Sequence, residues 1–473
     1  MNRTVLWTSE EAARATGGRA TKPWQAAGLS LDTRTIQPGD LFVALAGPKQ
    51  DGHAYVAQAL AKGAAAALVH RMPEGLGPEA PLLVAADTLA ALTALGQAGR
   101  ARSRAKVVAV TGSVGKTGTK EALRLALAAQ GATAASAKSH NNQWGVPLSL
   151  ALMAPDARFG VFEVGMNHPG EIAPLSRLVR PDVALITTIE AVHLGHFPSI
   201  GAIADAKAEI FDGMTAAGVA VLNHDNPFYH HLAQAARARG LRRIVSFGAH
   251  PDSTVRLADA EIGAEASRVV AQVGRSQIRY ALNVPGRHWI SNSLGVLAAV
   301  DALGADVERA AAALAALTPL PGRGQRHRVF LGDGYLTVID ESYNASPAAL
   351  KAALQVLAAT RPEPGGRRIA VLGDMLELGP EAPSMHAAFA VCAQAKGVDL
   401  VFTVGQHMRH LHDALPPAMR GLHAATGEEV LTAVLDEVRA GDVVLVKASR
   451  GMALERVVAA LVDMRPTPAR CNG

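Results

Sequence analysis

The clearest chemical signature in the chain is the stretch VVAVTGSVGKTGTKEALRLAL at 107–127. Its β-branched start predicts a strand, its glycines a tight turn, and its amphipathic remainder a helix. Glycines in such a turn let backbone amides approach phosphate oxygens, and the helix N-terminus adds the positive end of its dipole. Lys116 would contact the outer phosphates, and the Thr117 hydroxyl a magnesium ion. We therefore expect a nucleotide site formed by Gly112, Ser113, Gly115, Lys116 and Thr117.

The loop is a shortened variant of the common phosphate loop, which has another glycine at the position of Val110. The alternative interpretation is an ordinary strand-to-helix turn that happens to hold Gly-Lys-Thr. The strand before the turn and the helix after it are the context that phosphate binding requires, and they favour nucleotide binding.

Three more residues follow in positions suited to chemistry. Ligands of open α/β sheets gather at the carboxyl ends of strands. Glu163 ends the predicted strand FGVFE, and His193 follows the end of another. Lys207 lies among alanines and isoleucines on a predicted helix. Burial would lower its pKa until the neutral amine reacts with carbon dioxide, and the carbamate formed is an anion near bound metal.

The residues alone leave alternatives open at these three positions. Glu163 also suits a helix cap or a surface ion pair, and a lone histidine in such a place is more often structural. Lys207 also suits a solvated lysine whose stem covers apolar surface.

The elements that must position these residues separate into three regions. The first has short strands at 41–45 and 66–69 and ends in a charged helical run at 94–106. In the second, helices alternate with strands at 106–112, 159–165, 182–189, 218–223 and 244–248, and helices follow at about 289–303 and 306–317. The third repeats this alternation, with strands at 336–341, 367–373, 398–405 and 442–449.

Strands that alternate with helices predict parallel sheets covered by helices, so the fold class is α/β with three domains. We expect a small N-terminal α/β domain over 1–103 and a central, mostly parallel-sheet nucleotide-binding domain over 104–320. A C-terminal doubly wound, Rossmann-like domain would occupy 321–473. The second boundary rests on a break in the pattern at Pro319, Pro321, Gly322 and Gly324.

The composition is that of a globular protein with more than one core, since 49% of the 473 residues are apolar and 18% are charged. Aromatic residues make up only 4%, and the net charge of +5 forms no block of like charge, so a nucleic-acid partner is not expected. No stretch has the roughly 18 uncharged apolar residues of a membrane span, and no apolar signal core opens the chain. Two cysteines are too few for a disulfide framework. We expect a cytoplasmic location and a monomer.

The chain resembles the Mur ligases, the ATP-dependent amide-forming family of peptidoglycan precursor synthesis. Nine stretches in order along all three regions carry the resemblance: DTRTIQPGDLFVALAGPKQDGHAYV (32–56), TGSVGKTGTKE (111–121), NNQWGVPLSL (141–150), EVGMNHPGEI (163–172), AVHLGHF (191–197), AKAEIF (206–211), VIDESYNASPAAL (338–350), LGDMLELG (372–379) and VLVKASRGMALERVV (444–458). Two departures affect the loops near the predicted metals: Gly118 interrupts what is usually a run of threonines, and Gly195 stands where many relatives have an acidic residue.

The resemblance implies an activity and its partners. A member of this family with these C-terminal stretches would join D-alanyl-D-alanine to UDP-N-acetylmuramoyl-tripeptide through an acyl phosphate. Its cofactors would be ATP and two Mg²⁺ ions. Lys116, Lys207 and His193 would be the catalytic residues. Thr117 and Glu163 would hold one magnesium ion, His193 would bind a second, and Lys207 would be carbamylated.

The remaining site residues follow from the same resemblance. The nucleotide would meet Asn292 near adenine, Arg323 at phosphate and Asp340 at the ribose, although a helix cap, an interdomain ion pair and a turn are ordinary alternatives. The uridine diphosphate end would meet Asp32, Thr33 and Arg34, with His53 a weaker candidate, and the muramoyl-peptide end would meet Asn141 and Asn142. Lys447, Ser449 and Arg450 are candidates for the carboxylate of the dipeptide, with helix capping an equal alternative for Ser449.

Two other functions remain open. A folylpolyglutamate-synthase-like ligase would share the ATP domain and the acyl phosphate, but the DTR, PGDLFVAL and DGH segments of the first region speak against it. A nucleotide-dependent switch would bind ATP or GTP without making a bond, and a third domain with its own polar loops speaks against that.

Overall fold

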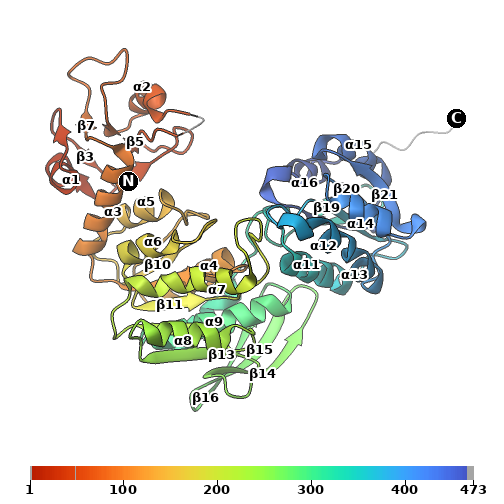
Figure 1. Ribbon diagram of the computed structural model, residues 1–473. Helices are drawn as coiled ribbons and strands as arrows, with labels where there is room; N and C mark the ends of the chain where they lie inside the picture. The colour runs from red at the N-terminus through yellow and green to blue at the C-terminus, as the bar shows by residue number, and fades with distance from the viewer. Residues whose placement is uncertain (1–2, 48–49, 466–473) are drawn as a thin grey trace.

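The computed structural model describes residues 3–47 and 50–465, which form three lobes (Figure 1). The N-terminal lobe holds a five-stranded sheet in the order β2 (Arg19–Ala20), β7 (Leu82–Val84), β6 (Ala66–Val69), β5 (Asp40–Val43) and β4 (Gly28–Ser30). All neighbours are parallel except β2 and β7. A separate pair, β1 (Trp7–Thr8) and β3 (Gln25–Ala26), lies beside it, and the helices are α1 (Ser9–Thr16), α2 (Val56–Ala61) and α3 (Thr88–Arg102).

The central lobe is a nine-stranded sheet. Its parallel part has the order β13 (Arg243–Gly248), β12 (Val219–Asn223), β11 (Val183–Ile186), β8 (Lys106–Thr111), β10 (Phe159–Glu163) and β9 (Thr133–Ala135). β8 is buried on both faces: Val108 and Val110 pack on one side and Val107 and Ala109 on the other. This explains why the strand reads as a continuous apolar run.

Helices cover both faces of this sheet. One face packs against α4 (Lys116–Ala128), α9 (Arg287–Ala302) and α10 (Val307–Ala313). The other packs against α5 (Gly145–Ala151), α6 (Ile172–Val179), α7 (Ile200–Ala208) and α8 (Tyr229–Ala238). The sheet continues into β14 (Val255–Ile262), β15 (Ser267–Val273) and β16 (Ser276–Leu282), which pair antiparallel with one another and were not predicted.

The C-terminal lobe is a six-stranded sheet in the order β17 (Gln325–Phe330), β18 (Tyr335–Glu341), β22 (Val443–Lys447), β19 (Arg368–Gly373), β20 (Leu400–Val404) and β21 (Arg420–Ala424). Only β17 and β18 are antiparallel. The helices α11 (Pro347–Ala359), α12 (Ala382–Ala387), α13 (Phe389–Ala395) and α14 (Met408–Ala414) cover one face. On the other face lie α15 (Gly427–Glu437) and α16 (Glu455–Val462).

The first lobe is held closely to the second. Gly96 and Gly99 of α3 lie against the backbone of Pro147 and Leu150 on α5, where a Cβ on Gly96 would come within 2.8 Å of the Pro147 carbonyl oxygen. The indole of Trp7 donates a hydrogen bond to the Ala151 carbonyl at 2.9 Å. The three-domain α/β class is confirmed, and the boundary residues stay predictions. Within the described residues, no helix is long and apolar enough to cross a membrane.

Candidate active site

The phosphate loop joins β8 to α4, as predicted. Gly112 has φ +145°, and a side chain there would collide with the Thr187 hydroxyl. Gly115 begins α4 with φ +85°, and a Cβ would lie 3.0 Å from Oδ1 of Asn292. Both glycines are therefore required by backbone conformation and by close neighbours. Nζ of Lys116 donates a hydrogen bond to the Gly112 carbonyl at 2.6 Å, so its side chain folds back onto the backbone of the loop.

Glu163 ends β10 directly beside this loop and is 1% exposed. Its Oε1 accepts a hydrogen bond from Nδ2 of Asn141 at 2.8 Å. Its Oε2 is buried and has no hydrogen-bond partner among the described residues. A buried carboxylate oxygen without a partner is costly, and a bound cation would satisfy it. Glu163 therefore fits the magnesium ion that the resemblance implies.

The other residues predicted to bind metal are not surrounded by a cluster of the usual metal-ligating side chains. In the part of the chain that the structure describes, no group of three histidine, cysteine or acidic side chains is arranged to hold a metal. Thr117 is 2% exposed, and its hydroxyl lies 3.5 Å from that of Ser139. Its neutral oxygen suits magnesium, which keeps several of its own waters.

Lys207 lies on α7 and is 1% exposed, so the solvated-lysine alternative is excluded. Burial holds its pKa well below the usual value, and the positive charge of nearby Lys116 lowers it further. Burial also lowers the pKa of Lys116, with Glu163 opposing the shift and Arg323 adding to it. Because two nearby lysine cations repel each other, Lys207, the more buried of the two, is favoured in its uncharged form.

His193 has φ +56° and points to the C-terminal lobe, where its Nδ1 pairs with the Glu377 carboxylate. The Glu377 carbonyl accepts a hydrogen bond from the Gly195 amide at 2.9 Å. Burial lowers the pKa of His193, Glu377 opposes the shift, and the charges of Lys116 and Lys207 add to it. The structure thus brings His193 near both lysines and pairs it with a residue that the sequence analysis did not single out.

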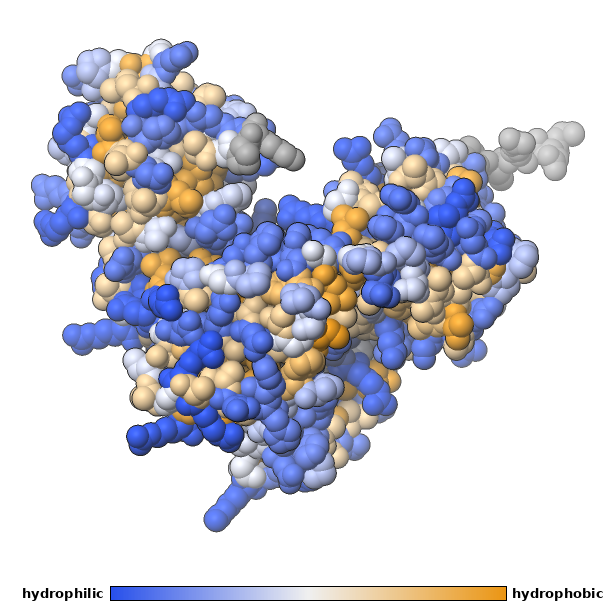
Figure 2. All heavy atoms as spheres, viewed as in Figure 1, coloured by the Kyte–Doolittle hydropathy of each residue, from blue (hydrophilic) through white to orange (hydrophobic). Residues whose placement is uncertain are grey.

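Lys116, Thr117, Glu163 and His193 line one cavity of about 1550 Å³. All three lobes contribute to its wall: α3 of the first lobe supplies Thr93 and Gln97, the second supplies the phosphate loop, and the third supplies Arg450. Figure 2 shows the molecule hollowed between the N-terminal and C-terminal lobes. Thirteen predicted site residues line the cavity: Ser113, Gly115, Lys116, Thr117, Asn141, Asn142, Glu163, His193, Asn292, Arg323, Lys447, Ser449 and Arg450. Gly112, Lys207, Asp340, Asp32, Thr33, Arg34 and His53 are not part of its lining.

Asp340 is used within the chain. It is 6% exposed, and its Oδ2 accepts a hydrogen bond from the Gly322 amide at 2.7 Å. Its Oδ1 accepts from the amide and hydroxyl of Ser342 at 3.1 and 2.6 Å. In this conformation Asp340 fixes the linker between the central and C-terminal lobes, and a ribose would have to share its carboxylate with these donors.

The three residues predicted to bind the dipeptide differ in how far contacts within the protein already engage their side chains. Lys447 is 2% exposed, and its Nζ donates to Glu341 Oε2 at 3.1 Å and to the Asn344 carbonyl at 3.0 Å. The Ser449 hydroxyl accepts from the Leu376 amide at 3.0 Å and does not cap the turn that follows. Arg450 is exposed and lines the cavity, and among the described residues its guanidinium donates a hydrogen bond only to the Tyr343 hydroxyl, at 3.4 Å. It is the best placed of the three to meet a carboxylate.

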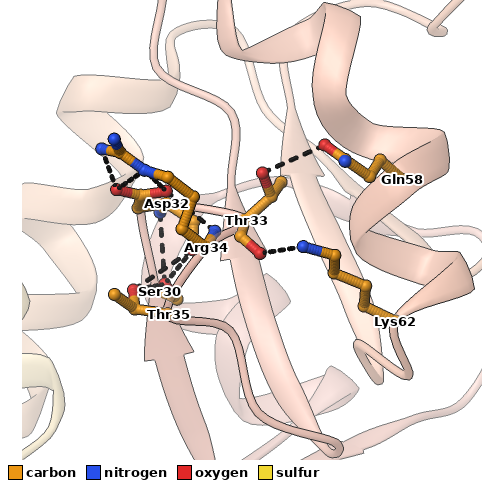
Figure 3. A network of polar contacts seen from close by, with 7 residues as sticks. All are labelled: Ser30, Asp32, Thr33, Arg34, Thr35, Gln58 and Lys62. Carbon is orange, nitrogen blue, oxygen red and sulfur yellow. Dashed lines mark hydrogen bonds and ion pairs between the residues drawn. The ribbon is translucent and has the colours of Figure 1, made fainter.

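The predicted nucleotide-sugar segment forms its own network in the N-terminal lobe (Figure 3). Arg34 pairs with the Asp32 carboxylate at 2.6 Å, and this hydrogen-bonded pair lowers the pKa of Asp32, with nearby Lys138 adding to the shift. The Thr33 hydroxyl donates to Gln58 Oε1 at 3.1 Å, and Lys62 Nζ donates to the Thr33 carbonyl at 2.7 Å. Lys138 belongs to the loop that carries Asn141 and Asn142, so this loop brings a positive charge close enough to act on Asp32.

His53 is buried within the same lobe. Its Nδ1 lies 2.7 Å from Asp51 Oδ1, and its Nε2 accepts from the His70 amide at 3.1 Å. Both ring nitrogens are engaged inside the protein, which favours a structural role for His53.

Comparison with known proteins assigns the chain to a family. Three family models match in order: the Mur ligase family catalytic domain over 25–92, the Mur ligase middle domain over 110–300, and the Mur ligase glutamate ligase domain over 322–450. The UDP-N-acetylmuramoyl-tripeptide--D-alanyl-D-alanine ligase of Escherichia coli is 36% identical over 437 residues, which cover 92% of this chain and 93% of that protein. The chain belongs to the Mur ligase family.

Solved Mur ligase structures share its architecture. A crystal structure of MurF from Acinetobacter baumannii superposes with a TM-score of 0.82 at 29% identity and covers 97% of this chain and 99% of that one. MurF ligase from Thermotoga maritima in complex with ADP superposes with a TM-score of 0.75 at 25% identity, over 92% of this chain and 97% of that one. The three-domain Mur ligase architecture therefore extends over nearly the whole chain, and ATP is the nucleotide that such ligases use.

The residues that line the cavity of this Mur ligase without a role assigned from the sequence include His288, Glu341, Tyr343 and Glu377. Glu341 and Tyr343 lie at the end of β18, where an acidic residue and an aromatic after a buried strand gave a local signal. His288 opens α9, and burial lowers its pKa, opposed by Glu341. Glu377 offered no local signal, because its partner is 184 positions away in the chain.

Proposed function

We propose that this Mur ligase joins D-alanyl-D-alanine to UDP-N-acetylmuramoyl-tripeptide and converts ATP to ADP and phosphate. The observation that carries the proposal is the cavity in which the phosphate loop, Glu163 and Arg450 of the C-terminal lobe meet. Oε2 of Glu163 has no hydrogen-bond partner among the described residues. Similarity to the E. coli enzyme over 92% of the chain supports the choice of substrates. ATP and a nucleotide-linked precursor suit a cytoplasmic reaction, and one chain supplies every proposed site residue, so a monomer suffices.

The reaction begins with two anions. The terminal carboxylate of the tripeptide attacks the γ-phosphorus of ATP, its oxygen bonds to phosphorus, and ADP leaves. Lys116 and Arg323 offset the charge on the transferred oxygens, because both cations border the cavity beside the phosphate loop. Thr117 and Glu163 would hold magnesium, which when bound supplies further positive charge to the phosphates.

The second step forms the amide. The amine of the dipeptide attacks the acyl carbon, and phosphate leaves with one oxygen of the original carboxylate. Acyl phosphates hydrolyse, so water must be kept out while the intermediate exists. The contact between His193 and Glu377 joins the central and C-terminal lobes at the cavity edge, which is where closure has to act.

A carbamate on Lys207 is part of the proposal. A carbamate forms only from an uncharged amine, and burial together with Lys116 lowers the pKa of Lys207 in the required direction. The modification replaces the neutral amine by an anion close to Lys116 and His193. It would therefore place a negative charge that attracts Lys116, and add a carboxylate-like ligand to the site.

The test is mass detection of the ligated product from UDP-N-acetylmuramoyl-tripeptide, D-alanyl-D-alanine and MgATP. We expect product and phosphate release only when both substrates are present. A nucleotide-dependent switch would hydrolyse its nucleotide slowly without either substrate. A folylpolyglutamate-synthase-like enzyme would extend a folate with glutamate and ignore the muramoyl tripeptide, and that result would overturn the proposal.

A further inference from the structure

Tyr343 contacts two arginines at the cavity wall. Cζ of Arg323 lies 4.1 Å from the centre of the Tyr343 ring, and Cζ of Arg450 lies 5.4 Å from the same centre. Nη1 of Arg450 also donates to the Tyr343 hydroxyl at 3.4 Å. All three residues line the cavity. One ring therefore meets a guanidinium from the interdomain linker and another from the loop after β22.

The two arginines need such a support. An arginine side chain has many rotamers, and a free one loses this freedom when it binds a ligand. Two guanidinium groups close together also repel each other when no anion lies between them. An aromatic ring attracts cations through its electron-rich face, so Tyr343 holds both arginines near the cavity before a ligand arrives.

The ring is fixed to the linker by its own backbone. The Tyr343 amide donates to the Gly322 carbonyl at 3.1 Å, and Gly322 in turn donates to Asp340 at 2.7 Å. Gly322 has φ +73°, and a Cβ there would lie 2.8 Å from Cβ of Tyr343. The linker and the end of β18 are thus in direct contact at this ring, and Arg323 is the next residue of the linker.

We propose that Tyr343 is a positioning residue that orients Arg323 toward the nucleotide phosphates and Arg450 toward the carboxylate of the incoming dipeptide. The proposal rests on the proposed function, which gives the two arginines these ligands. It assigns to one side chain the preparation of two binding contacts that come from different parts of the chain.

The experiment compares Tyr343→Leu, Tyr343→Phe and the control Tyr335→Leu. Tyr335 begins β18 in the same lobe, stacks on Arg328 at 4.2 Å from the ring centre and does not line the cavity. KM for ATP, KM for D-alanyl-D-alanine and kcat are measured, together with the affinity for ADP by calorimetry. Loss of a cation–π contact weakens binding by about 2- to 5-fold, which corresponds to about 0.5 to 1 kcal/mol.

We expect Tyr343→Leu to raise both KM values and to weaken ADP binding by that factor, with kcat changed less. Tyr343→Phe keeps the ring and loses only a long 3.4 Å hydrogen bond, so its values should stay within about two-fold of the unmutated protein. The control should leave all values unchanged. Unchanged KM values in Tyr343→Leu, an equal loss in Tyr343→Phe or an equal loss in the control would overturn the proposal.

The two proposals fail in different ways. If the unmutated protein makes no product, the proposed function is wrong, and ADP binding still tests the contact between Tyr343 and Arg323. If it makes product while Tyr343→Leu keeps both its ADP affinity and its dipeptide KM, only the role of Tyr343 is wrong. Thermal unfolding of all four proteins shows whether any loss comes from misfolding.

Discussion

Two replacements of Lys207 separate the loss of its amine from the loss of its buried side-chain volume. Lys207→Met keeps the volume of the stem and removes the amine, whereas Lys207→Ala empties the space of about three methylene groups. At about 0.8 kcal/mol for each buried methylene, the alanine variant should lose about 2 to 3 kcal/mol of unfolding free energy. Lys207 is 1% exposed and its pKa is lowered by burial, so the methionine variant should be at least as stable as the unmutated protein.

Both variants should lose about 10²- to 10³-fold in kcat, the usual effect of removing one charge-stabilising group from an active site. They should respond differently to short carboxylic acids. Acetate or propionate can enter the space left by alanine and supply a carboxylate where the carbamate would lie. Methionine fills that space, so the same acids should not restore its activity.

The assay is product formation by mass spectrometry against acid concentration, with chloride salts of equal ionic strength as a control. Denaturant unfolding of each variant gives the stabilities. Normal activity of Lys207→Met would show that the reaction needs no carbamate at this position, because methionine cannot form one. Equal rescue of both variants would also refute the carbamate, because the acid would then act elsewhere.

Three other predictions follow from single contacts. Lys116→Ala should abolish ligation without unfolding the protein, because the cation beside the phosphates is lost; phosphate release at an undiminished rate with both substrates would contradict this. Asn141→Ala removes the 2.8 Å hydrogen bond that orients Glu163, so the Mg²⁺ concentration for half-maximal activity should rise several-fold, and an unchanged magnesium curve would count against that role. His386 is 0% exposed, accepts from the Met375 amide at 3.0 Å, and has a pKa lowered by burial, so the fold favours its neutral ring. Between this lowered pKa and the unfolded pKa of about 6.5, the unfolded chain binds the proton more readily than the fold does. The free energy of unfolding should therefore decrease as the pH falls through this window, by up to about 1.4 kcal/mol per pH unit. His386→Gln should show a flatter profile in urea unfolding between pH 7.5 and 5.5, and an equally steep one would assign the loss to other groups.

The strands that carry the site were predictable because their signal is local. β8, β10 and β22 are buried on both faces of parallel sheets, so each reads as a continuous run of apolar residues. The phosphate loop follows one of these runs with its glycines in place. By contrast, β14, β15 and β16 were missed, although SQIRYAL at 276–282 alternates between exposed and buried residues as a half-exposed strand does.

The contacts between lobes were not predictable from local patterns. The family resemblance placed His193 and Lys207 near metal, but the pairing of His193 with Glu377 depends on how two lobes meet. Lys120 was not singled out from the sequence, yet it is 0% exposed and donates to the Ser136 carbonyl at 2.7 Å. Burial of a charge depends on tertiary packing that sequence spacing does not encode.

An oxygen label reports whether the tripeptide carboxylate passes through an acyl phosphate. UDP-N-acetylmuramoyl-tripeptide with ¹⁸O at both oxygens of its terminal carboxylate is ligated in unlabelled water. The released phosphate and the ligated product are then analysed by mass spectrometry. We expect one ¹⁸O in each phosphate and one in each new amide, because the carboxylate oxygen that attacks phosphorus leaves with it. Phosphate without the label, formed alongside ligated product, would contradict the acyl phosphate.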